Sequence, residues 1–227
     1  MEENNRKGSG VFYAVVGVAT LVVAIIGATF AYFSATATNN DTIIGSTATG
    51  NNIALAVKPI APVTEGRTEN MIPMLEDNLQ DGLTGTGGKS CIDSNGNTVC
   101  QVYKVTVTNN GATAVKLDAT LNLTTAKGSG EGTGANMKWQ LIQNATTEGT
   151  VGTMKSQGTA ELFADNLSLA ATTSQDFYIV VWLLETEGPQ DNTDAGINYT
   201  GTVTVNAVGA DGSTTSGLTA TFASQQA

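Results

Sequence analysis

The stretch 101–108, QVYKVTVT, decides the predicted fold because apolar and polar side chains alternate along it without interruption. One face carries Tyr103, Val105 and Val107, and the other carries lysine and threonine. The stretch 115–123, VKLDATLNL, repeats the alternation after the turn-forming sequence NNG at 109–111. A side-chain period of two is typical of strands with one buried and one solvated face, so we expect a hairpin here.

Similar segments recur along the rest of the chain. Alternating strands are expected at 52–57 (ending at Pro59), 137–141, 199–208 and, at a sheet edge, 217–222. The stretch 177–184, FYIVVWLL, is apolar on both faces, which predicts a central strand covered on both sides. It is expected to join the strand at 199–208 through a hairpin loop, and short apolar segments at 162–163 and 167–169 are expected between loops.

The number and spacing of these strands predict an all-β protein. About seven to nine short strands with regularly spaced turns indicate a jelly-roll or Ig-like antiparallel β-sandwich, which we place at 51–227. Trp139 and Trp182 lie within apolar strands and are expected in its core. Helical periodicity is confined to one apolar helix expected at the N-terminus.

A long loop is expected at 59–100, with a short helical turn near 73–79, because three of the four prolines and many glycines fall there. Its end carries the chain's two cysteines, Cys91 and Cys100, separated by the tight-turn sequence Asn95-Gly96. In an exported chain such a pair predicts a disulfide across a short hairpin. Closing so small a loop stabilises a fold by about 2–3 kcal/mol on the chain-entropy model.

The composition argues against catalysis. The 227 residues carry a net charge of −10 and include no histidine, which excludes Ser-His-Asp and Cys-His arrangements and the two-histidine zinc helix. We therefore expect no enzyme and no cofactor. The ten lysines and arginines are scattered, so a nucleic-acid partner is not expected either.

An acidic loop at 185–196 offers the one metal hypothesis. Glu187, Asp191 and Asp194 are weak candidates for extracellular calcium because carboxylates close together coordinate that ion. Their spacing does not fit the twelve-residue calcium loop, which favours a solvated loop without metal.

The N-terminus directs the chain toward a membrane. The run 11–33 is almost continuously apolar and, as a helix, is long enough to span a bilayer. Residues 1–31 are therefore a signal peptide or a transmembrane helix. Thr29 and Ala31 fit positions −3 and −1 of a cut between Ala31 and Tyr32, and 35–37 offers a second site. The length of the run favours a retained anchor instead, but both alternatives place the body outside the cell or on its surface.

Four segments together resemble a known family. They are 27–34 (GATFAYFS), the polar stretch and alternating strand at 39–57, the stretch 103–111 (YKVTVTNNG), and the Trp-containing strand, acidic loop and Val/Thr strand at 182–205. In this order they resemble the TasA/camelysin family of exported proteins, which a SipW-type signal peptidase processes. The resemblance implies a jelly-roll-like sandwich that assembles head to tail with copies of itself into extracellular fibres of a biofilm matrix.

In such fibres the N-terminal segment freed by cleavage pairs with a sheet of the next subunit. By position, the polar segment 32–50 supplies this donor strand. Its implied donor residues are Tyr32, Phe33, Ser34, Ala35, Thr36, Ala37 and Thr38.

Two alternatives remain open from the sequence. One is a membrane-anchored ectodomain that binds a surface partner or carbohydrate, with 32–50 as a stalk. The other is a type IV-like pilin cut near Gly8 or Gly10, in which the apolar helix forms a filament core. The pilin alternative lacks the acidic residue expected near the start of such a helix.

Overall fold

A computed structural model describes residues 52–62, 71–126, 134–149, 152–186, 197–210, 212 and 214–224. The predicted N-terminal helix, the cleavage site at Ala31 and Tyr32 and the donor segment at 32–38 lie outside these residues. The calcium candidates Glu187, Asp191 and Asp194 lie outside them as well. Within the described part, no helix is long and apolar enough to cross a membrane.

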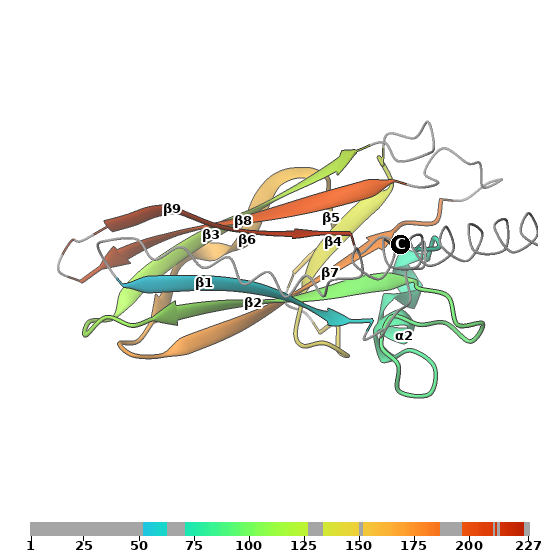
Figure 1. Cartoon of the computed structure of the whole chain (residues 1–227), viewed down its shortest axis with the longest axis horizontal. Helices are drawn as coiled ribbons and strands as arrows, with labels where there is room; N and C mark the ends of the chain where they lie inside the picture. Colours follow the sequence, from blue (N-terminus) through green and yellow to red (C-terminus); the bar gives the residue numbers. More distant parts are fainter. Residues whose placement is uncertain are drawn as a thin grey trace, which may run out of the picture. The chain divides into compact units, whose positions relative to one another are not determined.

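The described residues form nine strands arranged in two sheets (Figure 1). Their bounds are β1 Ile53–Ala61, β2 Cys100–Asn109, β3 Val115–Ala126, β4 Met137–Ile142, β5 Lys155–Ser156, β6 Gly158–Leu169, β7 Ser174–Leu183, β8 Asn198–Gly209 and β9 Thr214–Ala223. The first sheet has the order β1-β2-β7-β4-β5, and the second has the order β6-β3-β8-β9. Every pairing between these strands is antiparallel.

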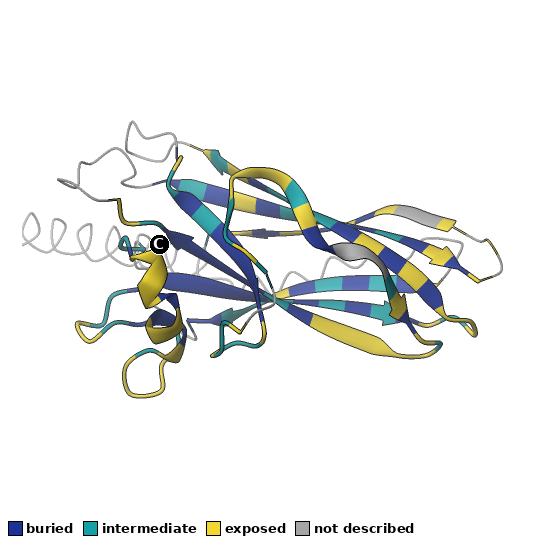
Figure 2. Cartoon of the chain, turned by 180° about the vertical axis from the view of Figure 1, so that it is seen from behind, coloured by how far each residue is buried: buried dark blue, intermediate teal, exposed yellow. Residues whose placement is uncertain are grey.

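One core lies between the two sheets. Along β3 the buried and exposed residues alternate as the period of two predicts, and the same alternation is visible along other strands in Figure 2. Leu121 and Leu123 of β3 and Val105 of β2 belong to one apolar cluster with the inward residues of the other long strands. Trp139 and Trp182 are both almost completely buried, which confirms their prediction as core residues.

The predicted hairpin of β2 and β3 is wrong. β2 pairs with β1 and β7 in the first sheet, whereas β3 pairs with β6 and β8 in the second. Between the two strands lies Asn109, which is fully buried. Its Nδ2 donates to the carbonyl oxygens of Thr113 at 2.8 Å and Ala170 at 3.0 Å. These bonds hold a corner through which the chain passes from one sheet to the other. β7 and β8 likewise belong to different sheets and form no hairpin.

Two strand boundaries also differ from the prediction. β1 does not end at Pro59 but continues to Ala61, with Pro59 opposite Tyr103. An edge strand tolerates proline because the missing N–H faces away from its one partner. The apolar segments at 162–163 and 167–169 are parts of one strand, β6, whose register against β3 shifts on both sides of Ala119.

The predicted loop 59–100 contains a packed module rather than an extended surface loop. The 3-10 helix η1 (Glu76–Asn78) leads directly into the short helix α2 (Leu79–Thr84), slightly later than the helical turn expected near 73–79. Leu79 and Leu83 pack with Val180 and Trp182 in a second apolar cluster. Residues 71–100 therefore cover the face of β7 that points away from the main core.

Candidate functional site: the open side between the sheets

The two sheets are close together along one side of the sandwich and separated by a groove along the other. On one side the Cα atoms of β1 and β9 approach within 8 Å of one another, so the two sheet edges lie close together. On the other side β4 and β7 of the first sheet and β6 of the second flank a groove of about 900 Å³. This groove is the candidate functional site.

The first wall of the groove arises because β4 is shorter than its partner. β4 pairs with β7 from Met137 opposite Leu183 to Ile142 opposite Tyr178. On this edge, no strand among the described residues pairs with 174–177, although β2 covers their other edge. The backbone of four of the ten residues of β7 therefore faces the groove.

The second wall is β6, the outermost strand of its sheet. With twelve residues it is twice as long as β4, and within the described part of the chain it pairs only with β3. Its register shifts near Phe163, and such bulges are over-represented at sheet edges and next to functional sites. An edge strand presents a row of backbone N–H and C=O groups to any further strand that arrives.

The floor of the groove is apolar. Phe163 of β6 and Phe177 of β7 stack with ring centroids 4.5 Å apart, and both are largely buried. Leu141 and Leu162 complete the floor. A largely apolar floor flanked by strand edges suits an extended peptide with alternating side chains.

Polar side chains line the rim. Glu148, Glu161 and Lys155 border the groove together with Gln175 and Asp176. Asp176 accepts hydrogen bonds from Thr106 Oγ1 at 2.6 Å and from Lys104 Nζ at 3.2 Å. The rim therefore carries more negative than positive charge, and an acidic segment would be repelled from it.

β4 ends where it does because a turn draws the chain away from β7. Gln143 N donates to the carbonyl oxygens of Thr147 and Glu148, which folds residues 143–148 back on themselves. Gln140 Nε2 donates to Glu148 Oε1 at 3.0 Å and to the Gly152 carbonyl oxygen at 3.2 Å. The chain therefore turns away before β4 can continue alongside residues 174–177 of β7.

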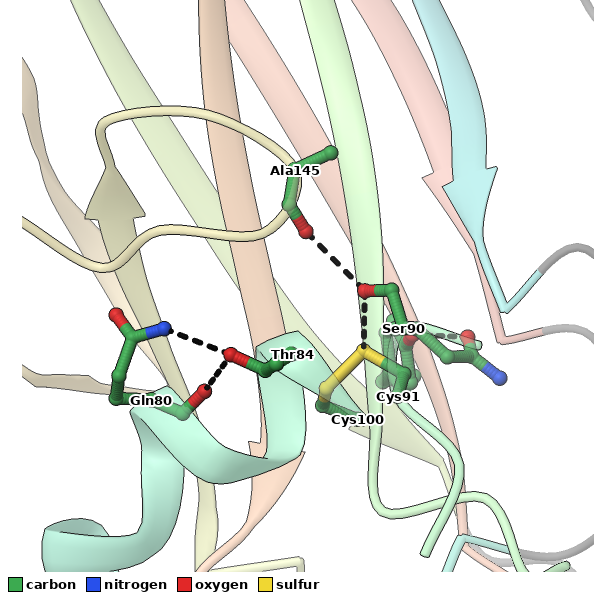
Figure 3. The surroundings of a disulfide bond; sticks show 8 residues. Gln80, Thr84, Ser90, Cys91, Cys100 and Ala145 are labelled. Atoms are coloured by element: carbon green, nitrogen blue, oxygen red, sulfur yellow. Dashed lines mark hydrogen bonds between the residues drawn. A yellow bond between two sulfur atoms is a disulfide. The ribbon is translucent and has the colours of Figure 1, made fainter. Parts of the chain in front are cut away.

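The packed module of residues 71–100, which contains the disulfide, contacts this turn from outside the groove. Ser90 Oγ donates to the Ala145 carbonyl oxygen at 3.1 Å, beside the disulfide of Cys91 and Cys100 (Figure 3). Gln80 of α2 bonds the turn twice, through Nε2 to the Thr146 carbonyl oxygen at 3.0 Å and through Oε1 to Glu148 N at 2.9 Å. The groove and the disulfide are thus parts of one connected structure.

The predicted disulfide is confirmed. Cys91 and Cys100 are bonded, with their Cα atoms 4.8 Å apart, and Ile92 pairs with Thr98 in the short hairpin that joins them. Asp93 orders this hairpin, a role that was not predicted from the sequence. Asp93 Oδ1 accepts from Asn97 N at 2.7 Å and from Asn95 N at 2.9 Å. These bonds, with the Asn97 backbone bond as the largest contribution, lower the pKa of the Asp93 carboxyl.

The groove itself was not predicted from the sequence. The apolar alternation of β4 and, in part, of β6 was visible in the sequence, but the turn that ends β4 is also held by residues far away in the chain. Among the described residues, no group of three or more cysteine, aspartate or glutamate side chains is placed to hold a metal ion. What the groove offers chemically is an apolar floor and unpaired strand edges.

Comparisons with known proteins do not assign the chain to a family. Neither a protein-family model nor a curated protein sequence matches it. Among solved structures, the structural genomics target SoR45 is 13% identical with a TM-score of 0.33, covering 79% of this chain and 90% of the other. The putative ApaA protein from Bordetella pertussis is 11% identical with a TM-score of 0.28, covering 77% and 91%. Likenesses this low carry no argument about function.

Proposed function

We propose that the protein is a non-enzymatic structural subunit of an extracellular fibre, which polymerises when the N-terminal segment of one copy pairs with a sheet of the next. The observation that carries this proposal is the open side of the domain, where strand edges border a groove with an apolar floor and a polar rim. An extended segment that adds to a sheet edge gains main-chain hydrogen bonds, and its alternate side chains fill the pockets beneath.

The strand order supports a jelly-roll assignment for the domain. β2, β7, β4 and β5 lie in one sheet and β6, β3 and β8 in the other, in the order that an eight-stranded jelly roll has when its strands are numbered along the chain. β9 occupies the place of the first strand, and β1 has joined the opposite sheet beside β2. This is the architecture that the resemblance to the TasA/camelysin family implies.

The disulfide supports an extracellular location, because such bonds persist in oxidising compartments. The apolar run 11–33 directs export, and a cut between Ala31 and Tyr32 frees 32–50 as the donor segment. Addition of each copy to the next in one direction, without closing a ring, produces a filament.

The test is N-terminal sequencing of protein recovered from the exterior of the producing cells, with electron microscopy of the same sample. We expect a chain that starts at Tyr32 and thin fibres that contain it. A chain that starts at Met1 in membrane-bound, fibre-free material would contradict the proposal and leave an anchored ectodomain. A filament whose subunits start near Val11 would instead indicate a pilin.

A further inference from the structure

We propose that the outer face of the second sheet binds an uncharged, extended polysaccharide chain through an array of threonine side chains. The array, which we call the threonine face, lies on the neighbouring strands β3, β8 and β9. It consists of Thr120, Asn122, Thr124, Thr200, Thr202, Thr204, Thr219 and Thr221. The inference goes beyond the proposed function, because it assigns a ligand to residues that do not line the groove.

The strand register arranges these side chains in three rows. The rows are Thr120 with Thr204 and Thr219, Asn122 with Thr202 and Thr221, and Thr124 with Thr200. Neighbouring side chains lie about 4.8 Å apart across the strands and about 6.8 Å apart along them. Small ligands favour concave pockets, whereas a repeating lattice of polar groups on an open face suits a polymer with repeating hydroxyl groups.

The polar groups of the threonine face are open to solvent. Thr124, Thr200, Thr219 and Thr221 are exposed, and the other four side chains are half-buried. Among the described residues, these side chains form a single hydrogen bond, in which Thr124 Oγ1 donates to the Thr200 carbonyl oxygen at 3.3 Å. The remaining hydroxyl and amide groups are therefore available to a ligand.

The threonines on the outer face of the first sheet are arranged differently. Thr106 Oγ1 donates to Asp176 Oδ1 at 2.6 Å, and the hydroxyl groups of Thr108 and Ser174 lie 2.8 Å apart. These hydroxyl groups already have partners, and a carboxylate lies among them. The two outer faces are thus alike in residue type but differ in what they offer a ligand.

Charge selects the class of ligand. The chain carries a net charge of −10, but none of the eight residues of the threonine face is charged, and Glu161 borders the face opposite Thr120. An anionic polymer or a second copy of the chain would be repelled by the molecule as a whole, and a cationic partner finds no carboxylate within the face. An uncharged polymer meets neither obstacle.

The chemistry of threonine suits such a polymer. Its hydroxyl group both donates and accepts hydrogen bonds, as a sugar hydroxyl does. Its β-branched side chain is stiff at χ1, so little side-chain freedom is lost when a ligand binds. The threonine face carries no aromatic ring on which a single sugar could stack, so affinity depends on many weak contacts along one chain. We therefore expect binding to a polymer and not to its monosaccharide.

Depletion of the protein from solution by insoluble polysaccharides tests the inference. The full-length chain is purified in an uncharged detergent, and the probes are amorphous cellulose and chitin. Carboxymethyl cellulose beads are the matched control, because they carry the same backbone with negative charge added. We expect saturable binding to cellulose, chitin or both, at least tenfold weaker binding to carboxymethyl cellulose, and no competition by glucose.

A pair of double variants locates the binding surface. Thr202→Val combined with Thr204→Val removes two hydroxyl groups while keeping side-chain shape and strand preference. Thr106→Val combined with Thr108→Val is the matched control on the other outer face, where both residues are half-buried as well. We expect the affinity to fall at least about fivefold in the first, the effect of one net hydrogen bond, and to stay within twofold in the second.

Circular dichroism of each variant confirms its fold. Thr219→Val combined with Thr221→Val repeats the measurement on the outer strand β9, where both side chains are exposed and contribute less to packing. We expect it to weaken polysaccharide binding in the same direction.

The outcomes decide the inference without reference to fibres. Failure of the wild-type chain to bind either probe would overturn it, as would equal binding to carboxymethyl cellulose or equal losses in the two central double variants. Sedimentation velocity covers the other occupant: if Thr202→Val with Thr204→Val lowers self-association and leaves polysaccharide binding unchanged, the face joins copies of the chain and the inference is wrong. None of these results bears on the start of the chain or on fibre formation, so the fibre proposal stands or falls separately.

Discussion

The hydroxyl groups of Tyr103 and Tyr199 lie 2.8 Å apart in the core, and they come from different sheets. Gln101 Oε1 accepts hydrogen bonds from both tyrosines, and the Tyr103 hydroxyl also lies 2.8 Å from the Ala223 carbonyl oxygen. Burial raises the pKa of both tyrosines well above the ordinary value of 10.0, so both remain neutral donors at physiological pH. A polar network thus connects β2, β8 and the end of β9 inside an otherwise apolar core.

We expect Tyr103→Phe and Tyr199→Phe each to lower the free energy of unfolding by about 1–3 kcal/mol, because buried polar groups lose partners. The double variant should lose less than the sum, since both hydroxyls belong to one network. Urea denaturation of the four proteins measures this coupling. Tyr178→Phe, on the half-buried outer face of β7, is the control and should change stability by less than about 0.5 kcal/mol. Strict additivity would contradict the network.

Gly201 makes room for the ring that covers this network. Phe222 lies opposite Gly201 across the β8–β9 pairing and stacks on Tyr103 with ring centroids 4.0 Å apart. A Cβ atom on Gly201 would overlap the Phe222 ring. We expect Gly201→Ala to destabilise the domain by about 1–3 kcal/mol through overpacking. Thermal unfolding should show that Phe222→Leu costs less in the Gly201→Ala background than alone, and equal costs would contradict the steric explanation.

Asn109 should be one of the most sensitive polar residues of the fold. Its side chain donates to the carbonyl groups of Thr113 and Ala170, and its Oδ1 accepts from Gly111 N at 2.9 Å. Asn109→Ala leaves these groups without their partner, and we expect a loss of about 2–4 kcal/mol in chemical denaturation. The adjacent, exposed Asn110→Ala is the matched control. Similar losses for the two variants would show that the corner does not depend on the Asn109 side chain.

This corner also explains why the strands were predictable from the sequence but their pairing was not. The alternation in 101–108 and 115–123 identifies two strands and their buried faces, because each side chain's face depends only on its neighbours along the chain. Whether the NNG at 109–111 forms a tight turn or a crossing depends on what surrounds Asn109. The carbonyl group of Ala170, about sixty residues away, decides that question.

The disulfide could likewise be predicted from the sequence, whereas the groove could not. With two cysteines across an Asn-Gly turn, the pairing of Cys91 with Cys100 needed no tertiary information. The groove lies beside the turn that ends β4, and Gln80 bonds this turn from 66 residues away in the chain. No local pattern in 137–148 indicates that contact, so the candidate site emerged only with the structure.

Asp93 should make the hairpin between the cysteines sensitive to acid. Its pKa is lowered in the folded protein from the ordinary 3.8, so its contribution to stability is present above about pH 4 and is lost as the pH falls through the folded value. An NMR titration should place the Asp93 carboxyl inflection below pH 3.8. The stability difference between wild type and Asp93→Asn should be larger at pH 7 than at pH 2.5. A difference that does not change with pH would contradict a role for the charged form.

Removal of the disulfide should loosen the groove as well as the module. We expect Cys91→Ala combined with Cys100→Ala to cost about 2–3 kcal/mol in denaturation, because the loop that the bond closes is short. Ser90 and Gln80 connect the module to the turn at 143–148, so amide hydrogen exchange should accelerate in that turn and in α2 but not in β3. Ser90→Ala, which removes only one connection, should accelerate exchange in the turn while leaving α2 protected. Unchanged amide hydrogen exchange at 143–148 without the disulfide would contradict this prediction. It would mean that the turn ends β4 without help from residues 71–100.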